Sequence, residues 1–134
     1  MFLLDQIERQ LPPAPARDPA APTALGGIRV VDFSHFIAGP YATMMLADFG
    51  ADVIKIEAPG KGDDFRHYPP TDPAFPAQGA SFFFANRNKR SVALDLKNAA
   101  ALEVVRELIA TSDVLVENFS TGVMQRFGLD PETC

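Results

Sequence analysis

The sequence of 134 residues has one cysteine, Cys134, and two histidines. A disulfide framework and a structural zinc site are therefore not expected, and no metal ligand set is assigned. Twelve Lys and Arg residues face seventeen Asp and Glu residues, a net charge of −5. No basic face dominates, so nucleic acid is not expected as a partner. No apolar run is long enough to span a membrane, and the N-terminus lacks the basic region of a secretory signal, so we expect a cytoplasmic protein.

Apolar residues make up 47% of the chain, which is enough for a globular core. The N-terminal part contributes least to that core. Pro12 and Pro13 end a possible short helix, and Pro, Ala and Asp dominate the stretch that follows. We therefore predict a Pro/Ala-rich extension at 1–26 and a folded domain at 27–134.

The stretch 27–57 organises this domain. Apolar residues at 28–33 indicate a strand, Pro40 is expected at the first helical position, Gly50 at the helix end, and 53–56 indicate a second strand. Such a strand–helix–strand unit implies parallel pairing. The later pattern predicts an irregular segment at 65–80, a helix at 81–86 driven into the core, a strand at 91–96, a helix capped by Asn98, a buried strand at 114–116 and a short helix ending at Gly128. The predicted fold class is α/β, a parallel sheet with flanking helices.

Ligands of such sheets bind outside the carboxyl ends of the strands, so the loop after the first strand is the first candidate site. It lacks the G-x-G-x-x-G fingerprint, which argues against a nicotinamide cofactor, although Glu57 stands about where a ribose-binding acid is expected. His35 is the titratable imidazole of this loop, and its alternative role is that of a loop histidine bonded to nearby backbone. The sequence 60–62, Gly-Lys-Gly, suggests a phosphate loop but lacks the Walker spacing.

The last residues carry helix-start signals, with Asp130 as a cap and Pro131 at the first helical position. Three residues cannot form a helix by themselves. We therefore expect the fold to be incomplete within this chain.

Four segments together resemble the N-terminal third of the class III CoA-transferases. They are GIRVVDFSHFIAGP (27–40), ADFGADVIKIE (47–57), NRNKRSVALDLK (86–97) and DVLVENFSTGV (113–123). That family includes formyl-CoA:oxalate transferase, the carnitine and bile-acid CoA-transferases and α-methylacyl-CoA racemase.

The resemblance implies a Rossmann-like, partial CoA-binding α/β domain at 27–134, and an interlocked homodimer in the full-length protein. It implies a transferase that moves CoA between an acyl-CoA and a carboxylic acid through a downstream Asp nucleophile that this chain does not contain. Racemases of the same family use a His/Asp pair, which would also lie downstream. We therefore assign no catalytic residue here, and treat coenzyme A or acyl-CoA as a substrate, with no prosthetic group. The alternatives are an acyl-CoA racemase of the same family and an inactive, truncated CoA-binding fragment.

Carried over by position, the CoA contacts implied by the resemblance are His35, Ile37, Ala38, Leu94, Asp95, Leu96, Lys97, Asn118, Phe119 and Arg126, with Arg66 and Arg90 as further cations. Lys97 and Arg126 would meet phosphate oxygens, and Asn118 would bond an amide or thioester. The alternatives are core packing for Leu94 and Phe119, a structural role for Asp95, and a helix-dipole role for Arg126.

Two departures from formyl-CoA:oxalate transferases concern the acyl site. Ile37 stands where those enzymes carry Gln, and Ala58 stands where relatives can carry a cation. Both argue against oxalate as substrate, and Ile37 suggests a less polar acyl site.

Overall fold

The computed structural model describes residues 21–74 and 79–133. Its elements are β1 (Arg29–Asp32), α2 (Ala38–Asp48), β2 (Asp52–Glu57), the 3₁₀ helix η1 (Asp64–His67), α3 (Ala80–Asn86), β3 (Arg90–Ala93), α4 (Ala99–Ala110), β4 (Val114–Val116) and α5 (Val123–Phe127). The strands form one parallel sheet in the order β3-β2-β1-β4. The predicted α/β class is confirmed. Most of the predicted extension at 1–26 lies outside the described residues.

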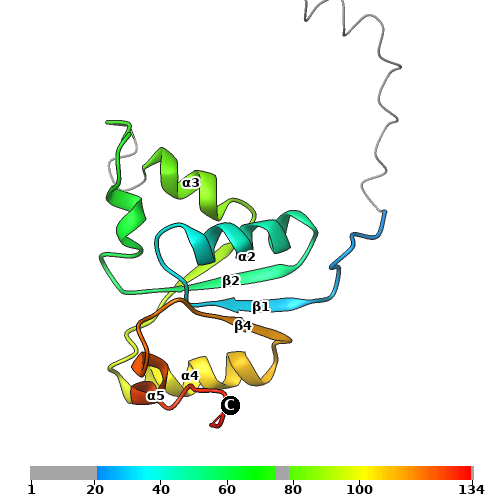
Figure 1. Cartoon of the computed structure of the whole chain (residues 1–134), viewed down its shortest axis with the longest axis vertical. Coiled ribbons are helices and arrows are strands. Elements are labelled where there is room, and N and C mark those ends of the chain that lie inside the picture. The colour runs from blue at the N-terminus through cyan, green and yellow to red at the C-terminus, as the bar shows by residue number, and fades with distance from the viewer. Residues whose placement is uncertain (1–20, 75–78, 134) are drawn as a thin grey trace, which may run out of the picture.

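The sheet separates two layers of helices, with α2 and α3 on one side and α4 and α5 on the other (Figure 1). Because side chains alternate along a strand, each central strand presents different residues to the two layers. Val31 and Ile54 are register partners and belong to the cluster that also contains Val105 of α4. Val30 and its partner Val53 belong to the smaller cluster with Ala47 of α2.

The helix of the first strand–helix–strand unit begins earlier than predicted. α2 starts at Ala38, so Pro40 occupies the third helical position and not the first. Pro is still tolerated there because N–H groups of the first turn have no partner within the helix. Gly50 follows the last turn with φ +102°, as predicted for the residue after a helix.

The segment 64–86 departs most from the prediction. Residues 65–67, expected to be irregular, belong to η1, whose cap Asp63 accepts a hydrogen bond from the Phe65 N–H. Of the three consecutive phenylalanines in α3, only Phe82 is buried, while Phe83 and Phe84 are 49% and 59% exposed. The helix that was expected to be driven into the core therefore buries one of its three phenylalanines, because residues one apart on a helix point in different directions.

The C-terminal half follows the predicted order. The Asn98 side chain caps α4 by accepting hydrogen bonds from the N–H groups of Ala100 and Ala101. β4 lies at the edge of the described sheet, so Val114 is 39% exposed where a buried strand was predicted. No helix in the described ranges is long and apolar enough to cross a membrane.

Candidate functional site

A cavity of about 300 Å³ lies where the carboxyl ends of the strands meet. Its apolar walls come from Phe33 after β1, Ile56 of β2, and Val123 and Phe127 of α5. Six residues predicted as CoA contacts line it: His35, Leu94, Asp95, Leu96, Lys97 and Phe119. The sheet topology therefore brings half of the predicted contacts to one place, although they come from loops up to 84 residues apart.

The polar groups at this cavity differ in the ion pairs and hydrogen bonds that they form with the protein. Lys97 is exposed and forms no ion pair among those found in the described residues. Asp95 accepts a hydrogen bond from the Lys97 backbone N–H at 3.0 Å, which supports the structural role considered for it. The ring of His35 packs on Phe119 at a centroid distance of 5.1 Å. The cavity thus combines apolar and aromatic walls with the ammonium of Lys97 and the carboxylates of Asp95 and Glu57.

Asn118 does not line the cavity but holds a residue that does. Its Oδ1 accepts from the His35 N–H, and its Nδ2 donates to the His35 carbonyl, both at 2.8 Å. The amide therefore bonds both backbone groups of one loop residue. His35 itself lines the cavity, and its ring packs on Phe119.

A buried polar network on the α2 side of the sheet was not predicted from the sequence. Asp32 accepts hydrogen bonds from Ser34, from Thr43 Oγ1 at 2.7 Å, and from Lys89 Nζ at 2.9 Å. Its register partner Lys55 lies 2.9 Å from Asp63. The signal in the sequence was a charged residue inside each apolar strand pattern, which is rarely buried without a partner.

Burial and charge oppose each other in this network. Burial acts to raise the pKa of Asp32, but Lys89, Lys55 and the hydroxyls of Ser34 and Thr43 together hold that pKa below its usual value. Burial lowers the pKa of Lys89 to about 8, although the Asp32 carboxylate favours its charged form. Both groups are satisfied by each other and by neighbouring oxygens, so we interpret them as structural.

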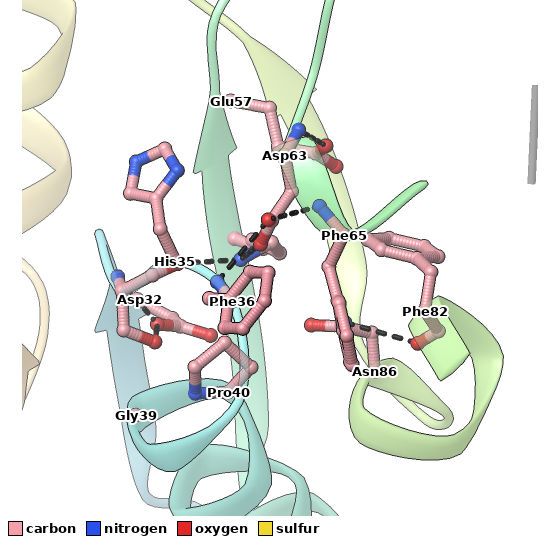
Figure 2. A network of polar contacts seen from close by, with 12 residues as sticks. Asp32, His35, Phe36, Gly39, Pro40, Glu57, Asp63, Phe65, Phe82 and Asn86 are labelled. Carbon is pink, nitrogen blue, oxygen red and sulfur yellow. Dashed lines mark hydrogen bonds and ion pairs between the residues drawn. The ribbon is translucent and has the colours of Figure 1, made fainter. Parts of the chain in front are cut away.

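Glu57 ends β2 between this network and the cavity. Its carboxylate accepts two hydrogen bonds from Arg66, at 2.6 and 2.7 Å, one from Ser91 Oγ at 2.6 Å and one from the Asp63 N–H at 2.9 Å. Burial alone would raise the pKa of Glu57, but these bonds lower it to about 2. Figure 2 shows Glu57 and Asp63 beside the loop that carries His35 and Phe36.

A family model described as CoA-transferase family III matches residues 25–134. The chain belongs to this family.

It is 49% identical over 109 residues to formyl-CoA:oxalate CoA-transferase of Rhodopseudomonas palustris (strain BisA53), covering 78% of this chain and 24% of that protein. It is 44% identical over 108 residues to succinyl-CoA:glutarate CoA-transferase of Mus musculus, covering 81% and 24%. A crystal structure of a CAIB/BAIF family protein from Brucella suis aligns with a TM-score of 0.77 and 42% identity, over 83% of this chain and 30% of that one. The chain thus spans about a quarter of the length of the curated family members it matches.

The remaining residues that the family resemblance implied lie outside the main cavity. Ile37 and Phe84 line a neighbouring cavity of about 290 Å³, and Ala38 is the first residue of α2. Arg66 is paired with Glu57 and lines a third cavity, of about 210 Å³, which shares Glu57 with the main one. Ile37 and Ala38 lie where the loop after β1 meets α2, and Arg66 lies in η1.

Two predicted cations are not brought to the cavity. Arg90 begins β3 and pairs at 2.6 Å with Asp52, which begins β2, so it lies toward the amino ends of the strands. Arg126 is exposed in the last turn of α5, where it suits the helix dipole, and it does not line the main cavity. Within 21–74 and 79–133, no group of three or more His, Cys, Asp or Glu side chains is arranged to hold a metal.

Proposed function

We propose that residues 27–133 form part of the CoA site of a transferase that moves CoA between an acyl-CoA and a carboxylic acid. The observation that carries this proposal is the apolar cavity at the strand ends, with Lys97 at its edge. Relatives named for formyl-CoA and oxalate, and for succinyl-CoA and glutarate, support this substrate class. CoA would be a substrate and not a prosthetic group.

The cavity offers two kinds of contact that CoA can use, apolar walls and a cation. Its apolar walls would pack the hydrocarbon parts of the pantetheine arm, since burial of apolar surface drives such binding. The Lys97 ammonium would bond phosphate oxygens. In the proposed reaction, an Asp from another part of a family-length polypeptide attacks the thioester carbonyl, and the CoA thiolate leaves as the mixed anhydride forms. We propose that this chain alone binds without transferring, and that the family-length protein works as a cytoplasmic homodimer.

Ile37 supports a proposal about the acid. Its side chain is 48% exposed in the loop between β1 and α2, near Phe65 and Phe84. An apolar surface there cannot hydrogen-bond a second carboxylate, so we propose an acid less polar than oxalate.

Isothermal titration calorimetry with CoA tests the binding proposal. We expect saturable binding, and a loss of about tenfold or more in affinity for Lys97→Ala, because a charge-assisted hydrogen bond is removed. Arg87→Ala is the control, since it removes an exposed cation paired with Asp48, away from the cavity. If neither this chain nor a family-length protein containing it binds CoA, the proposal is wrong.

A further inference from the structure

The backbone of the loop between β1 and α2 is held by side chains from both neighbours of β1, near β2 and just after β4. The Ser34 carbonyl accepts from Lys55 Nζ at 2.6 Å, and the Phe36 N–H donates to Asp63 Oδ1 at 3.2 Å. Lys55 and Asp63 form an ion pair whose side chains are 1% and 0% exposed. Figure 2 shows the Asp63 carboxylate between the backbone nitrogens of Phe36 and Phe65. This pair anchors the side of the loop that faces η1.

The conformation held in this way is unusual for the residue that adopts it. Phe36 has φ +69°, in the left-handed region that residues other than Gly seldom enter. Its ring packs against Phe65 at 4.8 Å and Tyr68 at 5.4 Å. Such strain persists only where the surroundings over-determine the backbone, and it occurs often at ligand sites.

On the side of the loop nearest the cavity, Asn118 is the one side chain of the described residues that hydrogen-bonds the His35 backbone. Its amide bonds both the N–H and the carbonyl of His35, and the following residue, Phe119, packs on the His35 ring. The amide comes from just beyond β4, 83 residues away in sequence, and it is exposed to solvent. Its replacement therefore leaves the core clusters intact.

We propose that Asn118 is a positioning residue, which fixes the His35 backbone so that the cavity wall is preformed for CoA. This inference rests on the proposed function. It differs from the role that the family resemblance implied, because the amide reaches the ligand through His35 and not by direct contact. Preorganised loops improve affinity because less ordering is needed on binding.

The experiment compares two variants of the full chain, Asn118→Ala and Asp113→Ala. The control is closely matched, because Asp113 also links β4 to β1 by a side-chain bond to backbone, at 2.8 Å to the Arg29 N–H, but at the amino ends of the strands. Hydrogen exchange of the His35 amide, followed by NMR without ligand, reports on the loop. Calorimetry with CoA reports on the site, and thermal unfolding reports on overall stability.

For Asn118→Ala we expect at least tenfold faster exchange at His35 and about tenfold weaker CoA binding, the loss expected for about one net hydrogen bond. For Asp113→Ala we expect a change in unfolding temperature similar to that of Asn118→Ala, while His35 exchange and CoA affinity stay unchanged. In the wild-type protein, the His35 amide should stay protected when CoA binds.

Three results would overturn the inference: unchanged His35 exchange in Asn118→Ala, faster exchange with unchanged CoA affinity, or loss of His35 protection in the wild type on adding CoA. The last result would mean that the side-chain amide of Asn118 leaves His35 to contact the ligand. Absence of CoA binding by the wild type would instead refute the proposed function, and exchange at His35 without ligand would still decide whether Asn118 holds the loop.

Discussion

The buried ion pair between Lys55 and Asp63 provides the sharpest test of what holds this fold. We expect Lys55→Met to destabilise the protein by about 3–5 kcal/mol, because a buried carboxylate is left without its counter-charge. Methionine is similar in length to lysine, so the change leaves little cavity. The Ser34 carbonyl also loses the hydrogen bond it accepts from the ammonium.

Lys61→Met is the matched control, since it breaks an ion pair of the same residue types at the surface. Lys61 and Asp64 lie 2.6 Å apart, and both side chains are 67% exposed. Solvent screens such pairs, so we expect a loss of less than about 1 kcal/mol. The exposed Lys61–Asp64 pair should therefore contribute less to the free energy of unfolding than the buried Lys55–Asp63 pair, although its atoms lie closer together.

Urea denaturation followed by circular dichroism measures both variants. Sucrose at one fixed concentration keeps the weaker variant folded at the start, because excluded osmolytes favour the compact state. Equal losses for the two variants would refute the assignment of Lys55 as a buried structural charge. A loss in Lys61→Met greater than in Lys55→Met would refute it as well.

Three further outcomes follow from the same structure. The pKa of Glu57 falls to about 2 in the fold, so its ionised form should contribute about 3 kcal/mol to the free energy of unfolding. This contribution should be complete above pH ~4.5 and disappear as the pH falls toward 2. Glu57→Gln should abolish this pH dependence in urea titrations across the same range. A Cβ added at Gly39 would lie 2.7 Å from Ser34 Oγ, so Gly39→Ala should lower stability by about 1–3 kcal/mol, measured by the same titration at pH 7. Val105→Ala should cost about 2 kcal/mol of unfolding free energy because the side chain is fully buried, whereas Val104→Ala, 50% exposed on the same helix, should change it by less than about 0.5.

The order of strands and helices could be predicted because it is encoded locally. Runs of Val and Ile, the cap at Asn98, and glycines after α2 and α5 each act within a few residues. The family motifs added a candidate place for the site, and residues 94–97 line the cavity found there. These signals do not depend on how distant segments meet.

The polar partners could not be predicted, because they depend on register between distant strands. Asp32 meets Lys89 across 57 residues, a contact that exists only after β1 and β3 have joined the same sheet. Arg90, which the family resemblance implied as a further cation for CoA, begins β3 opposite Ile54, and its guanidinium pairs with Asp52. A charge in a sequence does not show which end of the strand its side chain will reach.

The hydrogen bonds of the two carboxylates at the cavity argue against a chemical role for either of them. Glu57 and Asp95 both line it. Glu57 accepts four hydrogen bonds from protein groups, and a pKa of about 2 makes it a weak nucleophile and a weak base near neutral pH. Asp95 accepts from backbone in its own turn. A carboxylate that attacks a thioester must approach it without such partners, so we expect the reacting group of the proposed transferase to come from outside these residues. We also expect Glu57→Gln to affect the free energy of unfolding more than any step of transfer.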